Sequence, residues 1–177
     1  MQDSRRRGAS ALRFGVSIVL LVTLAFMTLV LPGCKADVSK FGGLKNFAYS
    51  YGSFNGGQRD FTITEASGDD VRSEGRYLFV AKGYNGVDLD VEVFVGPDVL
   101  DDIAAIIADN DIAAWDGFDE VDRDILDGYS FLLAAQYESG TIQASGYMKY
   151  PKNYEQGHAA LSEYLESLAA NYNRYGY

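Results

Sequence analysis

The chain has one cysteine and one histidine among 177 residues, and this scarcity excludes several kinds of site. A single cysteine, Cys34, rules out a disulfide within the chain. Structural zinc sites need clustered cysteine and histidine ligands, so these two residues cannot supply one. No Gly-x-Ser-x-Gly turn is present, and His158 with Ser162, four residues on, is a weak catalytic pair without a third group to orient it. We therefore expect His158 to be a partly exposed helix residue or a partner of Glu155.

Positive charge is also scarce in most of the sequence. Four of the 15 basic residues and one of the 25 acidic residues precede Cys34, so the chain from Cys34 onward has 11 basic and 24 acidic residues and a net charge of −13. Such a chain repels nucleic acid and anionic lipid head groups, which argues against a DNA or RNA partner. The acidity predicts a soluble surface, with cation binding as the alternative.

The sequence lacks an apolar run long enough for a confident transmembrane helix. The longest run, from Val16 to Val30, has 15 residues, whereas a spanning helix needs about 20. Four arginines between positions 5 and 13 precede this run, and the small residue Gly33 follows it. A basic region, a short apolar region and a small residue are typical of a secretory signal peptide, here residues 1–33. An uncleaved N-terminal anchor is the alternative.

The tetrapeptide Leu31-Pro32-Gly33-Cys34 resembles the lipobox of bacterial lipoproteins. The resemblance implies that Cys34 carries lipid on its sulfur and becomes the mature N-terminus. The protein would then lie outside the cytoplasm, held to the bacterial cell membrane through this lipid. Residues 34–46, with Gly42-Gly43 and several lysines, are expected to form a polar tether.

From Phe47 onward the patterns predict one α+β domain, residues 47–172, followed by a frayed tail, residues 173–177. Apolar residues alternate with polar ones in six segments, and two later segments have helical spacing. The expected strands are 47–51, 61–64, 77–81, 87–95, 130–138 and 141–150, and the expected helices are 97–110 and 156–172. The order β-β-β-β-α-β-β-α predicts an antiparallel sheet of about six strands with both helices packed on one face.

Two segments give the clearest patterns. In the segment 87–95 every second residue is valine or leucine and the residues between are mostly acidic, which predicts one buried and one wet face. In the helix that follows, Val99, Ile103 and Ile107 lie on one stripe. Trp115 continues this stripe beyond the helix, so we expect its ring to be buried.

The acidic stretch Asp119–Asp127 is expected to be a loop and is the candidate calcium site. Calcium takes six to eight oxygen ligands, and five acids crowd this stretch. Their spacing does not match an EF-hand loop, so we expect a solvated acidic loop without bound metal, with calcium binding as the alternative. Paired carboxylates also leave open a hydrolase that acts through acidic residues, which would need two acids converging in a cleft. No cofactor is expected.

Four segments together resemble a group of uncharacterised lipoproteins and secreted domains from anaerobic, gut-type bacteria. The segments are Gly83–Asp88, Trp115–Phe118, Leu126–Phe131 and Ala144–Pro151. The likeness extends over about residues 47–168 and implies the fold unit and the location outside the cytoplasm. It implies no activity.

A small tethered domain without a catalytic set is expected to bind a partner, and loop tyrosines suit polar recognition of an extracellular glycan or peptide. Three loop elements pair an aromatic with a polar residue, and we expect them to rim one shallow site. The candidate rim residues are Tyr84, Asn85, Asp116, Tyr150 and Tyr154. The alternative is that each tyrosine caps the core at its own sheet edge. An enzyme and a structural envelope protein are the rival classes.

Overall fold

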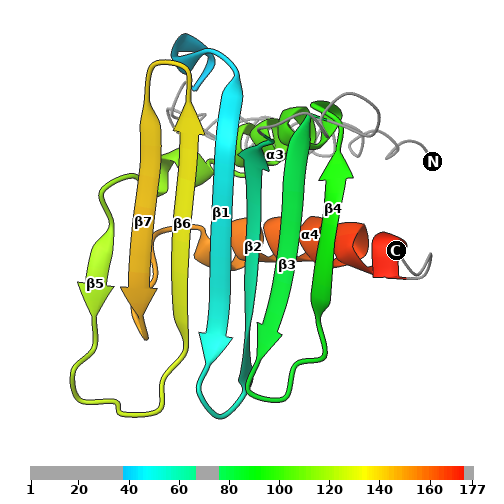
Figure 1. Cartoon of the computed structure of the whole chain (residues 1–177). Helices are drawn as coiled ribbons and strands as arrows, with labels where there is room; N and C mark the ends of the chain where they lie inside the picture. The colour runs from blue at the N-terminus through cyan, green and yellow to red at the C-terminus, as the bar shows by residue number, and fades with distance from the viewer. Residues whose placement is uncertain (1–37, 67–75, 174–177) are drawn as a thin grey trace, which may run out of the picture. The chain divides into compact units, whose positions relative to one another are not determined.

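In a computed structural model of the chain, residues 38–66 and 76–173 are described, and they form an α+β domain built on one seven-stranded sheet (Figure 1). The sheet has the order β4-β3-β2-β1-β6-β7-β5. The elements are η1 (Ser39–Phe41), β1 (Leu44–Ser53), β2 (Gly57–Glu65), β3 (Tyr77–Tyr84), β4 (Asp90–Val95), α3 (Asp98–Asp109), η2 (Ile112–Trp115), β5 (Asp119–Val121), β6 (Ser130–Tyr137), β7 (Thr141–Tyr147) and α4 (Tyr154–Asn173).

Hairpins account for most of the sheet. β1 and β2 pair through the turn around Asn55 and Gly56, and β6 and β7 pair through Ser139 and Gly140. In the β3–β4 connection, Asn85 and Gly86 have φ values of 56° and 91°, which Asn and Gly tolerate best. β1 lies at the centre because it pairs with β2 on one side and with β6 on the other.

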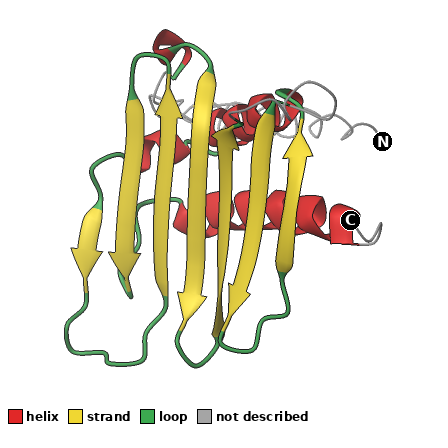
Figure 2. Ribbon diagram, viewed as in Figure 1, coloured by secondary structure: helices red, strands yellow, loops and turns green. Residues whose placement is uncertain are grey.

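Both α helices pack on one face of the sheet, as expected. Figure 2 shows them behind the strands, so that the viewer faces the uncovered side. Alternate residues of the strands meet the apolar stripes of α3 and α4 in one core. Trp115 is fully buried within it, as predicted, and its indole Nε1 donates to the carbonyl oxygen of Lys152 at 3.1 Å. At Gly157 of α4 a side chain would clash with the Trp115 ring, because a Cβ there would lie 2.6 Å from a ring carbon.

The expected sheet of about six antiparallel strands differs from the structure in two details. The residues Asp119–Val121, predicted as part of a loop, form a seventh strand, β5, which pairs parallel with β7. Ser145 N donates to Phe118 O and Asp122 N donates to Tyr147 O, both at 2.8 Å, so the exposed edge of β7 recruits these acidic residues through their backbone.

The fourth strand begins later than the alternation predicts. β4 starts at Asp90, whereas Val87 and Leu89 belong to the connection from β3. Leu89 O accepts a hydrogen bond from Gly83 N at 2.6 Å, and this bond closes the connection before the strand ladder begins. Of the predicted buried stripe, Val91 and Val95 are fully buried.

The expected tether, residues 34–46, is shorter than predicted. Leu44 already belongs to β1, and η1 precedes it. Ser139 N donates to Phe41 O at 3.0 Å, and the Phe41 ring lies 5.9 Å from that of Tyr137, so η1 packs onto the β6–β7 turn. The chain is therefore fixed to the domain from about Val38 onward.

Several predictions lie outside the described residues: the signal peptide 1–33, the lipid site Cys34 and most of the tail 173–177. Within residues 38–66 and 76–173, no helix has both the length and the apolar character needed to span a membrane.

Candidate functional site

The most prominent surface of the domain is the side of the sheet that the helices leave uncovered, here called the open face. Strand pairing sets its side chains in rows that run across the sheet. In the middle row, Ala48 is paired with Thr62 on one side and Ala134 on the other, and Ala134 is paired with Gln143. Small residues at the centre of this row make the sheet surface low there.

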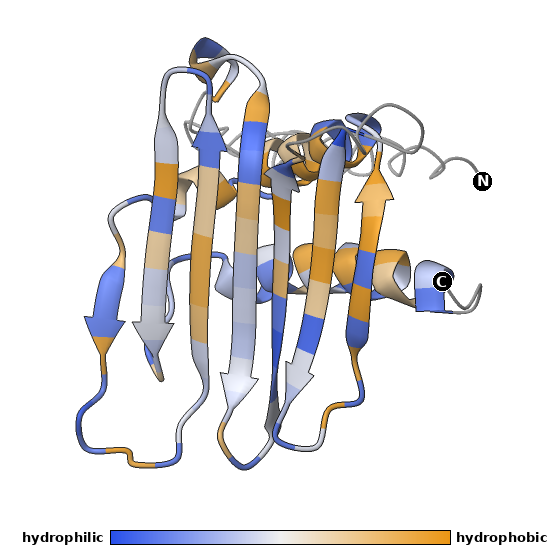
Figure 3. Cartoon of the chain, in the orientation of Figure 1, coloured by the Kyte–Doolittle hydropathy of each residue, from blue (hydrophilic) through white to orange (hydrophobic). Residues whose placement is uncertain are grey.

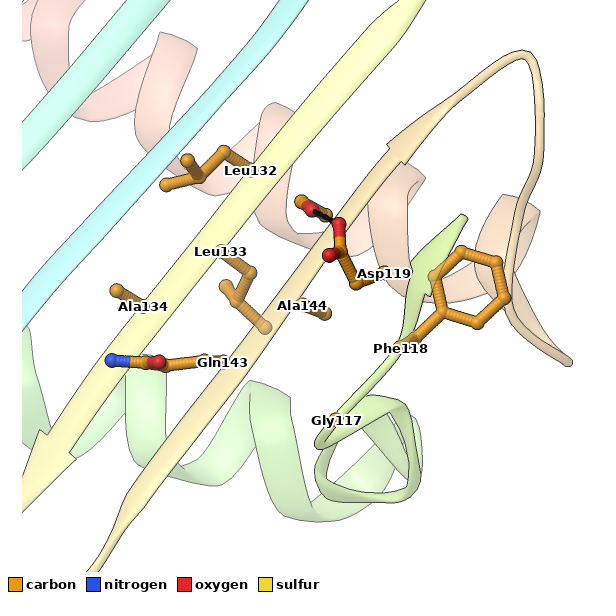
Figure 4. A pocket seen from close by; sticks show the side chains of 9 residues that line it. Gly117, Phe118, Asp119, Leu132, Leu133, Ala134, Gln143 and Ala144 are labelled. Atoms are coloured by element: carbon orange, nitrogen blue, oxygen red, sulfur yellow. Dashed lines mark hydrogen bonds between the residues drawn. The ribbon is translucent and has the colours of Figure 1, made fainter. Parts of the chain in front are cut away.

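Two adjoining hollows follow this row, and together they are called the central trough. One hollow, of about 380 Å³, lies over β2, β1, β6 and β7 and includes Ala48 and Thr62. The other, of about 480 Å³, lies between β6, β7 and the segment before β5 (Figure 4). Both hollows are lined by Ala134 and Gln143, so they adjoin at these two residues.

The end of the trough nearest β5 combines one carboxylate and one hydroxyl. Ser145 Oγ donates to Asp119 Oδ1 at 2.5 Å, the bond drawn in Figure 4. The preceding residue, Phe118, packs against the core instead, and its ring stacks 6.2 Å from that of the buried Phe131. Asp119 is therefore held in place by β7, and it forms a fixed negative point at one end of the trough.

The walls of the trough are polar on one side and apolar on the other. Asn46 Nδ2 donates to Gln136 Oε1 at 2.9 Å, which orients both amides along one wall. On the other wall, Leu132 is 48% exposed although it lies in the middle of the sheet. Figure 3 shows the hydrophobic middle of β6, separated by β7 from the largely hydrophilic β5. The trough thus offers an apolar contact flanked by hydrogen-bonding groups.

Two of the candidate rim residues, Tyr150 and Tyr154, lie together away from the open face. Their rings stack at 4.6 Å, and both line a separate hollow of about 470 Å³ at the junction of β7 and α4. Tyr154 is buried and contacts Trp115 at 5.4 Å between ring centroids. Asp116 follows that tryptophan, but its carboxylate accepts from Gln143 N at 2.9 Å and so caps the edge of β7.

The remaining rim residues, Tyr84 and Asn85, lie elsewhere. They form the turn after β3, and three strands, β2, β1 and β6, separate β3 from β7 in the sheet. At about 4.8 Å per strand the separation is roughly 19 Å. The structure therefore brings Tyr150 near Tyr154, but it does not bring Tyr84 and Asn85 to them. A ligand role for any of these residues stays a prediction.

His158 belongs to an aromatic cluster between α4 and the sheet. Its Nδ1 lies 2.7 Å from the Tyr49 hydroxyl, and its ring stacks on Tyr154 at 5.3 Å. Burial lowers the pKa of His158, although Glu166 opposes this, and burial raises the pKa of Tyr49. Ser162 Oγ bonds instead to the carbonyl oxygen of Ala159, so the structure does not pair it with the histidine.

A second part of this cluster is ionic. Glu166 accepts a hydrogen bond from the Tyr51 hydroxyl and lies 3.2 Å from Arg59 Nε. Burial and, to a smaller extent, the hydrogen bond to Glu166 raise the pKa of Tyr51, so both favour the protonated phenol. The side chains of Tyr51, Arg59 and Glu166 join α4 to β1 and β2. This arrangement is typical of a structural contact.

The acidic side chains between positions 119 and 127 do not converge. Asp119 binds Ser145, Asp122 lies 3.6 Å from Lys149 Nζ, and Tyr147 holds the later part of the stretch through Leu126 O and Gly128 N. In the described part of the chain, no group of three or more histidine, cysteine or acidic side chains is arranged to hold a metal ion. These bonds position the stretch beside β7.

No protein-family model matches the chain, and no curated protein matches it either. The candidate site therefore depends on its own geometry. Sequence reasoning missed the central trough because Ala48 and Ala134 are unremarkable alone. Only the strand register places them side by side, and β1 and β6 are about 80 residues apart in the chain.

Proposed function

We propose that this protein is a lipid-anchored bacterial lipoprotein whose domain binds a partner outside the cytoplasm through the open face. The observation that carries the proposal is the central trough, two adjoining hollows on the uncovered side of a large sheet. A sheet covered by helices on one side normally exposes charged or polar side chains on the other. Ala48, Ala134 and the exposed Leu132 depart from that pattern.

The lining favours a protein segment as the partner. Leu132 offers an apolar contact, and the amides of Asn46, Gln136 and Gln143 offer donors and acceptors for a peptide backbone. Sugar recognition usually uses exposed aromatic faces, and the trough has little of this surface because Phe47 is buried beneath it. Of the two partner classes that the sequence suggested, the peptide is therefore favoured.

The alternatives have weaker support from the geometry. A glycoside hydrolase uses two carboxylates across a cleft, whereas Asp119 is the carboxylate that lines the trough. A calcium site needs several convergent oxygens, and the acids of the 119–127 stretch point to separate partners. The binding function is accordingly the one that the site supports best.

Cross-linking in the cell envelope tests the proposal. A photo-reactive amino acid replaces Leu132 on the open face or Ala159 on the exposed side of α4, in the full-length protein. We expect a discrete cross-linked product from position 132 only. Ala134→Arg, which fills the trough floor, should abolish this product and leave the melting temperature nearly unchanged. The same products from both positions would refute the open face as the binding surface.

A further inference from the structure

The described domain begins only four residues after Cys34, and this short connection has a consequence for the bilayer. η1 is docked on the β6–β7 turn, and Phe41 N donates to Val38 O at 3.0 Å, so the fixed structure starts at Val38. Four residues reach at most about 14 Å when fully extended. A domain anchored at Cys34 therefore stays close to the membrane surface at this end.

Resting on the proposed lipid anchor, we propose that the end of the domain formed by η1 and the β6–β7 turn is a membrane-facing surface that lies against anionic lipid. Figure 1 shows η1 beside the β6–β7 turn at one end of the strands and the β1–β2 turn at the other. β1 has ten residues, so the far turn is about 33 Å away along the strand. The domain then stands on its end, with the strands directed away from the bilayer.

Charge opposes the alternative in which the domain lies on its helices. The residues of α3 include four aspartates and those of α4 include three glutamates, and neither helix contains lysine or arginine. An anionic bilayer repels such a layer. The open face is also acidic towards β4, where Asp90 and Glu92 point outward beside Lys82.

Charge at the proposed surface has the opposite character. Lys40 belongs to η1, with its Nζ 5.3 Å from the centre of the Phe41 ring, and Lys45 follows in β1. Lys45 lies 2.7 Å from Glu138, which neutralises that acid of the β6–β7 turn. A lysine close to an anionic membrane is attracted by its surface potential. This end thus has two lysines against one acid, in contrast to the acidic helices.

The free thiol of an introduced cysteine provides the test, because Cys34 is the only native cysteine and lipid would block it. Single cysteines replace Ser139 at the proposed surface, Asn55 at the far turn, Ala159 on α4 and Leu132 on the open face. Each full-length lipoprotein is labelled with a fluorophore at the introduced cysteine and is bound to vesicles of phosphatidylethanolamine and phosphatidylglycerol. The vesicles contain a lipid with a quencher attached to its head group. We expect quenching to be strongest at position 139 and weakest at position 55.

The outcomes separate the orientation from the anchor. Vesicle flotation is measured first, with Cys34→Ala as the control. A wild-type protein that does not float with the vesicles would overturn both the lipid anchor and the membrane-facing surface that depends on it. Flotation with equal quenching at all four positions, or with stronger quenching at 159 or 132 than at 139, would overturn the orientation alone. Lys40→Glu should reduce quenching at 139, whereas Lys152→Glu should not.

Discussion

His158 lies half-buried between α4 and the sheet, where its Nδ1 meets the Tyr49 hydroxyl at 2.7 Å. Its pKa is lowered mainly by burial, which penalises the charged imidazolium. Because it is the only histidine of the chain, its protonation is not confused with that of another imidazole. The residue thus offers a direct measurement of how the α4 interface responds to acid.

We expect His158 to make the domain less stable as the pH falls below neutral. In the unfolded chain a histidine titrates near pH 6.5, and the folded pKa is lower. The unfolded state therefore binds the proton first, so the free energy of unfolding decreases from about pH 6.5 down to the folded pKa and is unaffected above that range. Urea unfolding of the wild type and His158→Gln at neutral and mildly acidic pH measures this.

The difference between the two proteins isolates the histidine, because the carboxylates titrate in both. The wild type should lose more stability on acidification than His158→Gln, and the two should differ by a constant amount above neutrality. Parallel losses would mean that Nδ1 keeps an ordinary pKa and that the contact with Tyr49 does not depend on the neutral ring.

Among the elements, η1 shows how a segment with tether-like composition becomes part of the domain. Its sequence has no hydrophobic period, and the neighbouring glycines and lysines are typical of a linker. The Phe41 ring nevertheless covers Gly140 and packs near Tyr137. That contact depends on the β6–β7 turn, about 100 residues later in the chain, and no local pattern indicates it.

Phe41→Ala should lower the free energy of unfolding by about 1–2 kcal/mol. Truncation of a fully buried phenylalanine costs about 3–5 kcal/mol, and Phe41 is only half-buried. Phe54→Ala is the matched control because Phe54 lies in the β1–β2 turn and is 75% exposed, so its loss should cost under about 0.5 kcal/mol. Equal effects of the two substitutions in denaturant unfolding would show that η1 is not docked in solution.

β5 shows that a strand can form where the local sequence pattern does not indicate one. Aspartate and glutamate are depleted in strands, and Asp119–Val121 has no alternation long enough to indicate one. The strand exists because β7 has an edge to satisfy and the chain after η2 passes beside it. Long periodic segments such as α3 and β6 lie close to their predicted positions, since their own apolar faces determine their structure.

For the whole molecule, the alternation of polar and apolar residues predicted an α+β fold with one wet sheet face, but not the shape of that face. The trough depends on which residues stand beside Ala134, and this register is fixed by contacts between distant strands. The sequence predicts that Tyr84 and Tyr154 lie in loops that share one site, whereas Tyr84 ends β3 and Tyr154 begins α4. Strand order separates them, and strand order cannot be read from local periodicity.

The whole domain should fold without metal, because one continuous core joins all the larger strands to both helices. We expect the chain from Lys35 to Tyr177 to melt at the same temperature with calcium and with a chelator. A calcium contribution of about 1 kcal/mol would move the midpoint by roughly 4 °C in a domain of this size, which thermal unfolding detects readily.

Asp122→Asn and Asp124→Asn together provide the control. A calcium-dependent rise that disappears in this double variant would contradict the prediction, and it would assign the cation to the acidic stretch. An unchanged midpoint in both proteins would support the prediction, as expected for carboxylates with separate partners, Asp119 with Ser145 and Asp122 with Lys149.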